Sequence, residues 1–140
     1  MHHLFEANRL LRETGERIAA AAGQTHARRL VLQAASGGAT VPQIARALGL
    51  HRQGVQRIAD DLVLDGLASY TDNPRHSRSK RLVVTVHGQA SLRAIRRVHD
   101  EWLRQLVASN AAADWSALAS SLEALSQAVR GRSERPTGRG

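Results

Sequence analysis

Mostly apolar residues recur near the start of the chain at alternating steps of three and four. The residues on this stripe are Leu4, Ala7, Leu11, Thr14 and Ile18. Because an α-helix makes one turn in about 3.6 residues, such a stripe lies along one helix face. The pattern therefore predicts a helix over residues 1–22, ended by Gly23, and a second helix from the N-cap residue Thr25 to Ala35.

Residues 40–65 contain two more helical patterns, separated by a glycine. Thr40 and Gln43 have the spacing of a capping box, although Val41 could equally begin the helix, because a residue before proline resists helical angles. This pattern ends near residue 48, Gly49 supplies the turn, and the next helix is predicted over residues 52–65. Its inward stripe consists of Val55, Ile58, Ala59 and Leu62. Two short helices joined by a tight corner are typical of a DNA-reading helix–turn–helix.

A hairpin pattern and two long helical patterns complete the chain. Gly66 stands where a left-handed residue would close the preceding helix. Strands are predicted over residues 67–71 and 80–84, with turn-forming residues between them. Thr85 is the expected N-cap residue of a helix that reaches about residue 109. Asp114 is the expected N-cap residue of a last helix. The apolar positions of this last helix are Trp115, Leu118, Leu122, Leu125 and Val129.

Composition narrows the class of protein. The 140 residues predict one domain, over residues 1–130, followed by a disordered tail over residues 131–140. The formal net charge of +8 favours a polyanionic partner, nucleic acid before membrane. The absence of cysteine excludes disulfides and thiolate metal sites. No apolar run approaches the ~20 residues of a membrane span, and no secretory signal is recognisable, so a cytoplasmic protein is expected.

The helix predicted over residues 52–65 has a polar face opposite its apolar stripe. That face consists of Arg52, Gln53, Gln56 and Arg57. Arginine can pair with guanine O6 and N7, and glutamine with adenine N6 and N7, so these residues are candidates for reading bases in the major groove. Thr40 and Gln43 are further candidates for contacts to the DNA backbone. The plainer interpretation is the solvated face of an ordinary helix pair.

The charge pattern that follows favours the DNA interpretation. Residues 73–99 contain no acidic residue. The cations of this span are Arg75, Arg78, Lys80, Arg81, Arg93, Arg96 and Arg97. A surface of one sign is expected to face phosphate. Arg75 and Arg78 are therefore predicted to serve the hairpin tip in the minor groove, and Lys80 and Arg81 to hold phosphates.

The order of these parts resembles the MarR family of winged-helix transcriptional regulators. The motifs that carry the resemblance are Ile44-Ala45, Leu48-Gly49-Leu50, Arg52-Gln53, Val55 through Leu62, Asp65-Gly66-Leu67, the wing Asn73 through Arg78, and Val84 through Gly88. The chain departs from the family at His76, where the wing usually has aspartate, at His51, where Ser or Thr usually caps the recognition helix, and at Arg29, often aromatic in the family.

The resemblance implies a mainly α fold with a small β-wing. A winged helix-turn-helix at residues 40–85 would be flanked by dimerisation helices at residues 1–35 and 86–130. The resulting homodimer would present two recognition helices about 34 Å apart to a pseudo-palindromic operator in double-stranded DNA. The resemblance also implies a repressor released by a small, often aromatic ligand, for which His26, Arg29 and His99 are candidate polar contacts.

Other classes of function have weaker support. The sequence contains none of the GxSxG, GxxxxGK[ST] or GxGxxG motifs, so no enzyme and no cofactor are expected. The histidines lack ligand spacing, so no metal site is expected. A non-specific architectural DNA-binding protein remains the main alternative, since basic charge alone would suffice for it. A third hypothesis is a winged helix used for protein docking.

Overall fold

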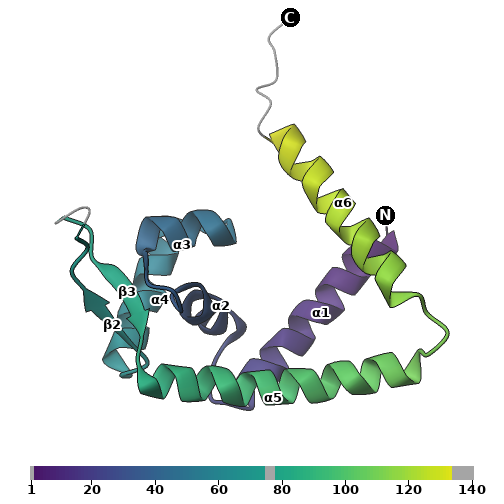
Figure 1. Cartoon of the computed structure of the whole chain (residues 1–140), viewed down its shortest axis with the longest axis horizontal. Helices are drawn as coiled ribbons and strands as arrows, with labels where there is room; N and C mark the ends of the chain where they lie inside the picture. The colour runs from purple at the N-terminus through teal and green to yellow at the C-terminus, as the bar shows by residue number, and fades with distance from the viewer. Residues whose placement is uncertain (1, 75–77, 134–140) are drawn as a thin grey trace, which may run out of the picture. The chain divides into compact units, whose positions relative to one another are not determined.

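A computed structural model describes residues 2–74 and 78–133 of the chain (Figure 1). Arg75, His76 and the part of the predicted tail after residue 133 therefore lie outside the described residues. Within the described residues the elements follow in the order α1 (His2–Ala20), α2 (His26–Ala34), β1 (Ala39–Thr40), α3 (Val41–Leu48), α4 (Arg52–Leu64), β2 (Ala68–Thr71), β3 (Arg81–Val84), α5 (Val86–Ser109) and α6 (Trp115–Ser133). This mainly helical architecture with a small sheet is the predicted one.

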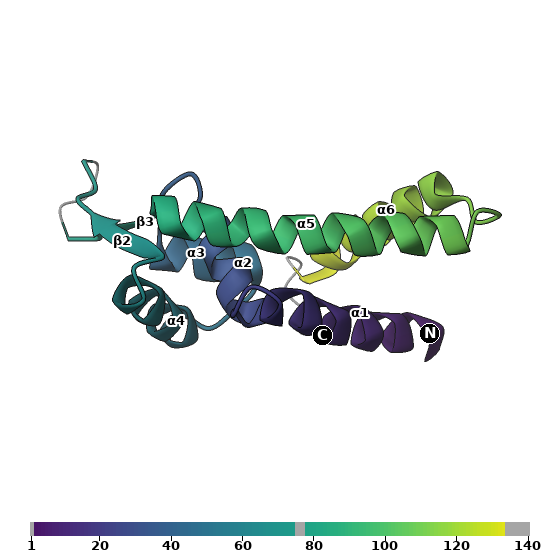
Figure 2. The same ribbon diagram turned by 90° about the horizontal axis from the view of Figure 1, so that it is seen from below.

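The chain divides into two compact units, residues 1–101 and residues 102–140. The first contains α1 to α4, the sheet and most of α5, and the second contains the end of α5 and α6. In the first unit, β2 and β3 form a hairpin that extends beyond the helices at one end (Figures 1 and 2). This hairpin is the wing predicted from the sequence.

The sheet has one strand more than the two predicted. Its order is β1-β3-β2, and both pairings are antiparallel. Leu82 of β3 faces Ala39 of β1 on one side and Tyr70 of β2 on the other. The prediction missed β1 because a strand of two residues has no alternation to detect, and it forms only because β3 offers a free edge.

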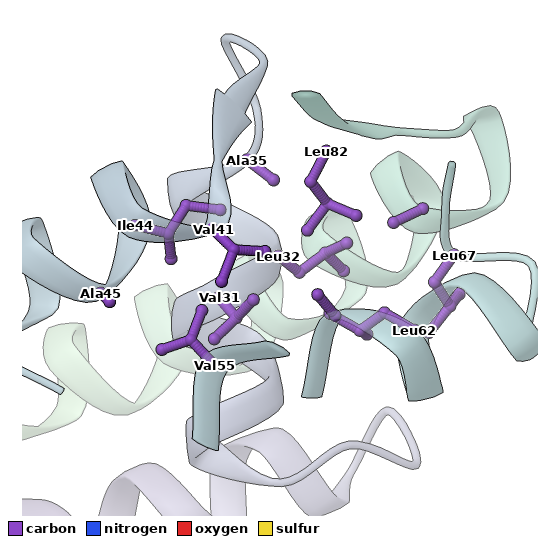
Figure 3. Packing of buried hydrophobic residues seen from close by; sticks show 12 residues of the cluster. Val31, Leu32, Ala35, Val41, Ile44, Ala45, Val55, Leu62, Leu67 and Leu82 are labelled. Carbon is purple, nitrogen blue, oxygen red and sulfur yellow. The ribbon is translucent and has the colours of Figure 1, made fainter. Parts of the chain in front are cut away.

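The core of the first unit lies between α2, α3, α4 and the sheet (Figure 3). Val31 and Leu32 of α2 and Leu82 of β3 are fully buried there. Val55 and Leu62 of α4 are also fully buried, as their stripe predicts. Burial of this stripe fixes the rotation of α4 about its axis and so turns its polar face outward.

The ends of the short helices follow the sequence signals. The Thr40 hydroxyl accepts a hydrogen bond from the Gln43 backbone N–H, and the Gln43 side chain accepts one from the Thr40 N–H, which completes the capping box. Gly49 and Gly66 have φ angles of 64° and 72°. Because only glycine adopts this left-handed region without steric cost, both positions close their helices as predicted.

The first turn of α5 is tied to the end of α4. The Thr85 hydroxyl donates to the Gly66 carbonyl at 2.7 Å and accepts from the Gly88 N–H at 3.1 Å. The Thr85 N–H donates to the Leu67 carbonyl oxygen at 3.1 Å. Gly88 is buried against this same oxygen, which would lie 2.0 Å from a Cβ atom at Gly88. The hairpin and α5 are therefore joined by a contact that requires glycine.

The second unit contains an amphipathic helix with an uncovered apolar face in the single chain. Asp114 caps α6 by accepting from the Ala117 N–H at 2.9 Å. The exposed apolar side chains are Leu118, Leu122, Leu125 and Val129. The helix continues to Ser133, so the predicted start of a disordered tail at residue 131 is wrong. Arg130 and Arg132 in the last turn favour this extension, because cations stabilise the negative end of a helix dipole.

Candidate nucleic-acid interface

The outer face of α4 presents the four residues predicted to read bases. Arg52, Gln53, Gln56 and Arg57 are all exposed, opposite the buried stripe of the helix. At the start of α4, His51 is the N-cap residue, and its side chain makes no capping hydrogen bond. The first backbone N–H groups of α4 consequently have no side-chain cap, as expected where His51 replaces the usual Ser or Thr.

The wing and the α4 face meet at one cavity of about 250 Å³. Arg52 and Gln56 of α4 line it together with Arg78 and Lys80, which precede β3. The remaining lining residues are Val41, Pro42, Tyr70 and Ser79. Thus the structure brings together candidates more than twenty residues apart in the sequence, and three of them are cations.

A hydrogen-bonded triangle joins the outer face of α4 to the wing. Gln56 Nε2 donates to Asp60 Oδ1 at 2.9 Å and to Tyr70 Oη at 2.8 Å. The Tyr70 hydroxyl in turn donates to the same Asp60 oxygen at 2.7 Å. Partial burial, followed by the hydrogen bond and charge of Asp60, raises the pKa of Tyr70 to about 12, so the phenol keeps its proton near neutrality.

The sequence analysis did not identify Tyr70 and Asp60 as candidate site residues. The i, i+4 spacing of Gln56 and Asp60 was visible and is compatible with a side-chain hydrogen bond on one helix. Tyr70 is distant in sequence, and only strand pairing brings its hydroxyl to α4.

Arg81 makes contacts within the protein that the sequence did not predict. Its Nη2 donates to the carbonyl oxygens of Gly37 at 2.9 Å and Gly38 at 2.7 Å, and its Nε donates to Gly38 at 3.2 Å. Two of its three guanidinium nitrogens are therefore occupied by the loop before β1. The charged group of Arg81 therefore fastens that loop to β3, and its predicted contact to a DNA phosphate stays a prediction.

Replacement of Arg81 by alanine is expected to lower the free energy of unfolding by about 1.5–3 kcal/mol, because hydrogen bonds from a charged donor are lost. Urea unfolding of both proteins measures this difference. Arg12→Ala, which removes an exposed arginine of α1, is the control and should change stability by less than about 0.5 kcal/mol. Equal effects of the two substitutions would contradict the structural role of Arg81.

Thr40 also belongs to the fold rather than to the exposed surface. Its side chain is buried, and its hydroxyl is engaged with Gln43 in the capping box. The hydroxyl of Thr40 thus serves the cap, and the predicted contact of Thr40 to the DNA backbone stays a prediction. Gln43 is exposed, and its predicted contact to the DNA backbone stays a prediction.

A second cavity, of about 290 Å³, lies between α2 and α5 within the first unit. Its lining residues are Arg29, Gln33, Ser36, Leu92, Ile95, Arg96, His99 and Asp100. The Nε atom of Arg29 is buried and has no hydrogen-bond partner among the described residues. The structure thus places two of the three predicted ligand contacts, Arg29 and His99, around the same space.

His26, the third predicted ligand contact, does not line this cavity. Its ring lies against Gly15 of α1, where a Cβ atom would come within 2.7 Å of Nδ1. Burial lowers the pKa of His26, and the nearby Arg29 charge lowers it further, against the opposing effect of Glu16. The His26 ring also lies 3.4 Å from Arg29 Nη2 through its Nδ1 atom, and its predicted contact to a ligand stays a prediction.

These features define a winged-helix protein. Residues 28–85 match a family model described as winged helix-turn helix. The uncharacterized protein Rv2011c of Mycobacterium tuberculosis is 47% identical over 112 residues, which cover 79% of this chain and 74% of that protein. The crystal structure of the MarR family transcription regulator SP03579 superposes with a TM-score of 0.81 and 26% identity, over 96% of this chain and 95% of that one.

A further solved structure has the same fold. The Mycobacterium tuberculosis transcriptional regulator MosR, solved in complex with DNA, has a TM-score of 0.69 and 23% identity, over 93% of this chain and 95% of that one. The chain contains a winged helix-turn helix and has the fold of MarR family transcription regulators, which are not enzymes. Among the described residues, no helix has the length and apolar character required to span a bilayer.

Proposed function

We propose that the protein is a homodimeric, sequence-specific transcriptional regulator, a repressor, that binds a pseudo-palindromic site in double-stranded DNA. The observation that carries this proposal is the cavity at which the polar face of α4 meets Arg78 and Lys80 of the wing. In this arrangement α4 enters the major groove and the basic wing follows the adjacent backbone. The structural similarity to a regulator solved in complex with DNA supports the same assignment.

Apolar side chains on the terminal helices support dimerisation. Leu10 and Leu11 of α1 are about half exposed in the single chain, and so is the row on α6 from Leu118 to Val129. Helices with an uncovered apolar row are stabilised when a partner covers it. A two-fold dimer would carry two copies of α4 to successive turns of one DNA face.

Selection of bound duplexes from a random pool tests this function. We expect a pseudo-palindromic consensus that binds ~10³-fold or more tightly than random duplex at the same salt concentration. A ratio near one would instead support the architectural alternative. Absence of binding to any duplex at low salt would support a winged helix used for protein docking.

Replacement of Lys80 by alanine is expected to weaken binding to all duplexes alike. Because each phosphate contact releases about one counterion, the slope of log K against log salt should become shallower by about one for each subunit. Fluorescence anisotropy at several salt concentrations measures the slope. Gln53→Ala, a neutral change on α4, is the control and should leave the slope unchanged. An unaltered slope for Lys80→Ala would exclude a phosphate contact.

The cavity between α2 and α5 supports release of DNA by a small acidic ligand. The unpaired Nε of Arg29 and the neighbouring Arg96 suit a carboxylate, and Leu92 and Ile95 suit an apolar ring. Benzoate is a suitable test compound, and we expect it to lower operator affinity in the wild type but not in Arg29→Ala. Equal responses of the two proteins would contradict this site, and no response in either would favour a constitutive regulator.

A further inference from the structure

We propose that Tyr70 and Asp60 position the wing for DNA binding. The hydrogen bond from the Tyr70 hydroxyl to the Asp60 carboxylate fixes β2 against the outer face of α4, so that the base-reading face and the cations of the wing meet one duplex together. Tyr70 is a positioning residue, since this role requires no contact between the phenol and DNA. The inference rests on the proposed function and adds the link between its two DNA-binding parts.

Tyr70 is the third of the four residues of β2, in the hairpin that extends beyond the helices (Figure 1). Because side chains alternate along a strand, Tyr70 lies on the same face of β2 as the buried Ala68. Its ring is partly buried against the core and pairs across the sheet with the fully buried Leu82. The next residue, Thr71, is exposed. The core therefore holds the ring, and the hydroxyl reaches α4.

The hydrogen bond between Tyr70 and Asp60 has a charged acceptor. The distance from Tyr70 Oη to Asp60 Oδ1 is 2.7 Å, as expected for a hydroxyl that donates to a carboxylate. Gln56 Nε2 lies 2.9 Å from the same Asp60 oxygen and 2.8 Å from Tyr70 Oη, so the amide donates to this pair as well. Partial burial and the Asp60 hydrogen bond raise the pKa of Tyr70 to about 12, and the hydroxyl keeps the proton that it donates near neutrality.

The position of Asp60 supports the same role. Asp60 is exposed on the helix that carries Arg52 and Arg57, where a carboxylate is repelled by DNA phosphate. Among the described residues Asp60 forms no ion pair, so neutralisation of a nearby cation does not explain it. Its carboxylate accepts hydrogen bonds from Tyr70 and Gln56. The contact with the wing thus accounts for an acid on this face.

The cavity beside this contact explains why the wing requires a link to α4. Arg52 of α4 and Arg78 and Lys80 of the wing line about 250 Å³ together with Tyr70. Three cations around so small a space repel one another, and in the free protein this repulsion acts to move the wing away from α4. The hydrogen bond between Tyr70 and Asp60 opposes that movement. Both parts are then in place before DNA binds, and less conformational entropy is lost on binding.

A double-mutant cycle between Tyr70→Phe and Lys80→Ala tests the inference by fluorescence anisotropy. Phenylalanine keeps the ring and removes only the hydroxyl, without a change of charge. In the wild type we expect Lys80→Ala to weaken binding to the selected duplex about tenfold, since one phosphate contact is lost in each subunit. In the Tyr70→Phe background the wing is no longer fixed, and Lys80→Ala should weaken binding only about threefold or less. Tyr70→Phe alone should weaken binding about three- to tenfold.

Gln53→Ala is the matched control for this cycle. Gln53 is exposed on α4, whose rotation is fixed by its buried stripe and not by Tyr70. We therefore expect Gln53→Ala to change affinity by the same factor in both backgrounds, within about twofold. A general loss of stability in Tyr70→Phe would leave the factor for Lys80→Ala at its wild-type value. Such additivity of Tyr70→Phe and Lys80→Ala would overturn the inference.

Two substitutions of Asp60 repeat the test on the other partner. Asp60→Asn and Asp60→Ala remove the same charge, but only asparagine keeps an oxygen that accepts from the Tyr70 hydroxyl. We expect the factor for Lys80→Ala to stay near about tenfold in Asp60→Asn and to fall to about threefold or less in Asp60→Ala. Because Asp60 is exposed, this pair decides the question even if Tyr70→Phe does not fold. Equal factors in the two variants overturn the inference.

The outcomes separate this inference from the proposed function. Additive cycles in a protein that selects a consensus site overturn only the inference. If binding shows no sequence preference, the proposed function fails, and the same cycle on random duplex still decides the inference because the Lys80 contact is to phosphate. Absence of binding to any duplex at low salt overturns both.

Discussion

Replacement of Gly88 by alanine is expected to destabilise the protein by about 2–4 kcal/mol, because the new methyl group has no room. An added Cβ would lie 2.0 Å from the Leu67 carbonyl oxygen and 2.7 Å from Val84 Cγ1. The first of these atoms belongs to the backbone, and the same oxygen accepts the Thr85 N–H, so it cannot retreat without breaking that hydrogen bond. Urea unfolding followed by circular dichroism measures the loss.

Gly54→Ala is the matched control for this substitution. Gly54 also lies within a helix, but nothing is within 4 Å of a Cβ atom placed there. Alanine at Gly54 is expected to stabilise the free protein by up to about 1 kcal/mol through its higher helix propensity. A Gly88→Ala variant as stable as the wild type would contradict the close contact between Gly88 and the Leu67 carbonyl oxygen.

Replacement of Arg57 by alanine is expected to have the largest effect on DNA recognition. A bidentate contact to guanine discriminates by about 1–3 kcal/mol, and a two-fold dimer makes it twice, so the loss on the selected site should be about 2–6 kcal/mol. The binding free energy for random duplex should fall much less, since non-specific binding depends mainly on phosphate contacts. The measurement is the ratio of the two affinities at one salt concentration.

Arg12→Ala is the control for this measurement, because Arg12 is an exposed arginine on α1 and belongs to neither α4 nor the wing. It removes the same charge and should leave the ratio of affinities unchanged. Equal losses on selected and random duplexes for Arg57→Ala would show that Arg57 contacts phosphate and does not read a base. Sequence-specific binding itself would then depend on the remaining residues of the α4 face.

The helices and their ends could be predicted from the sequence because their causes are local. The capping box at Thr40 needs only a partner three residues away, and Gly49 and Gly66 need only their own φ angles. The apolar period of α4 determines which side is buried, and therefore which side carries Arg52, Gln53 and Arg57. The polar face of the candidate site was accordingly predictable before any tertiary contact was known.

The partners of the polar side chains were not predictable, because each depends on residues far along the chain. Arg81 and Lys80 are neighbours in the sequence with the same charge, yet Arg81 is bound to Gly37 and Gly38 and Lys80 is exposed. The difference arises because β1 pairs with β3 and brings the glycine loop beside one of them. Similarly, His26 and Arg29 are three residues apart, but only Arg29 lines the cavity with His99.

By itself, the sequence determined where the helices of the winged helix-turn-helix begin and end and which face of α4 is polar, since hydrophobic period, capping and glycine conformation act over a few residues. Only the tertiary structure decided which polar groups on that face have partners within the protein. Gln56 is hydrogen-bonded to Asp60 and Tyr70 because strand pairing sets a phenol against the helix. A hydrogen bond depends on position within a few tenths of an ångström, and that position is set by the packing of the whole unit.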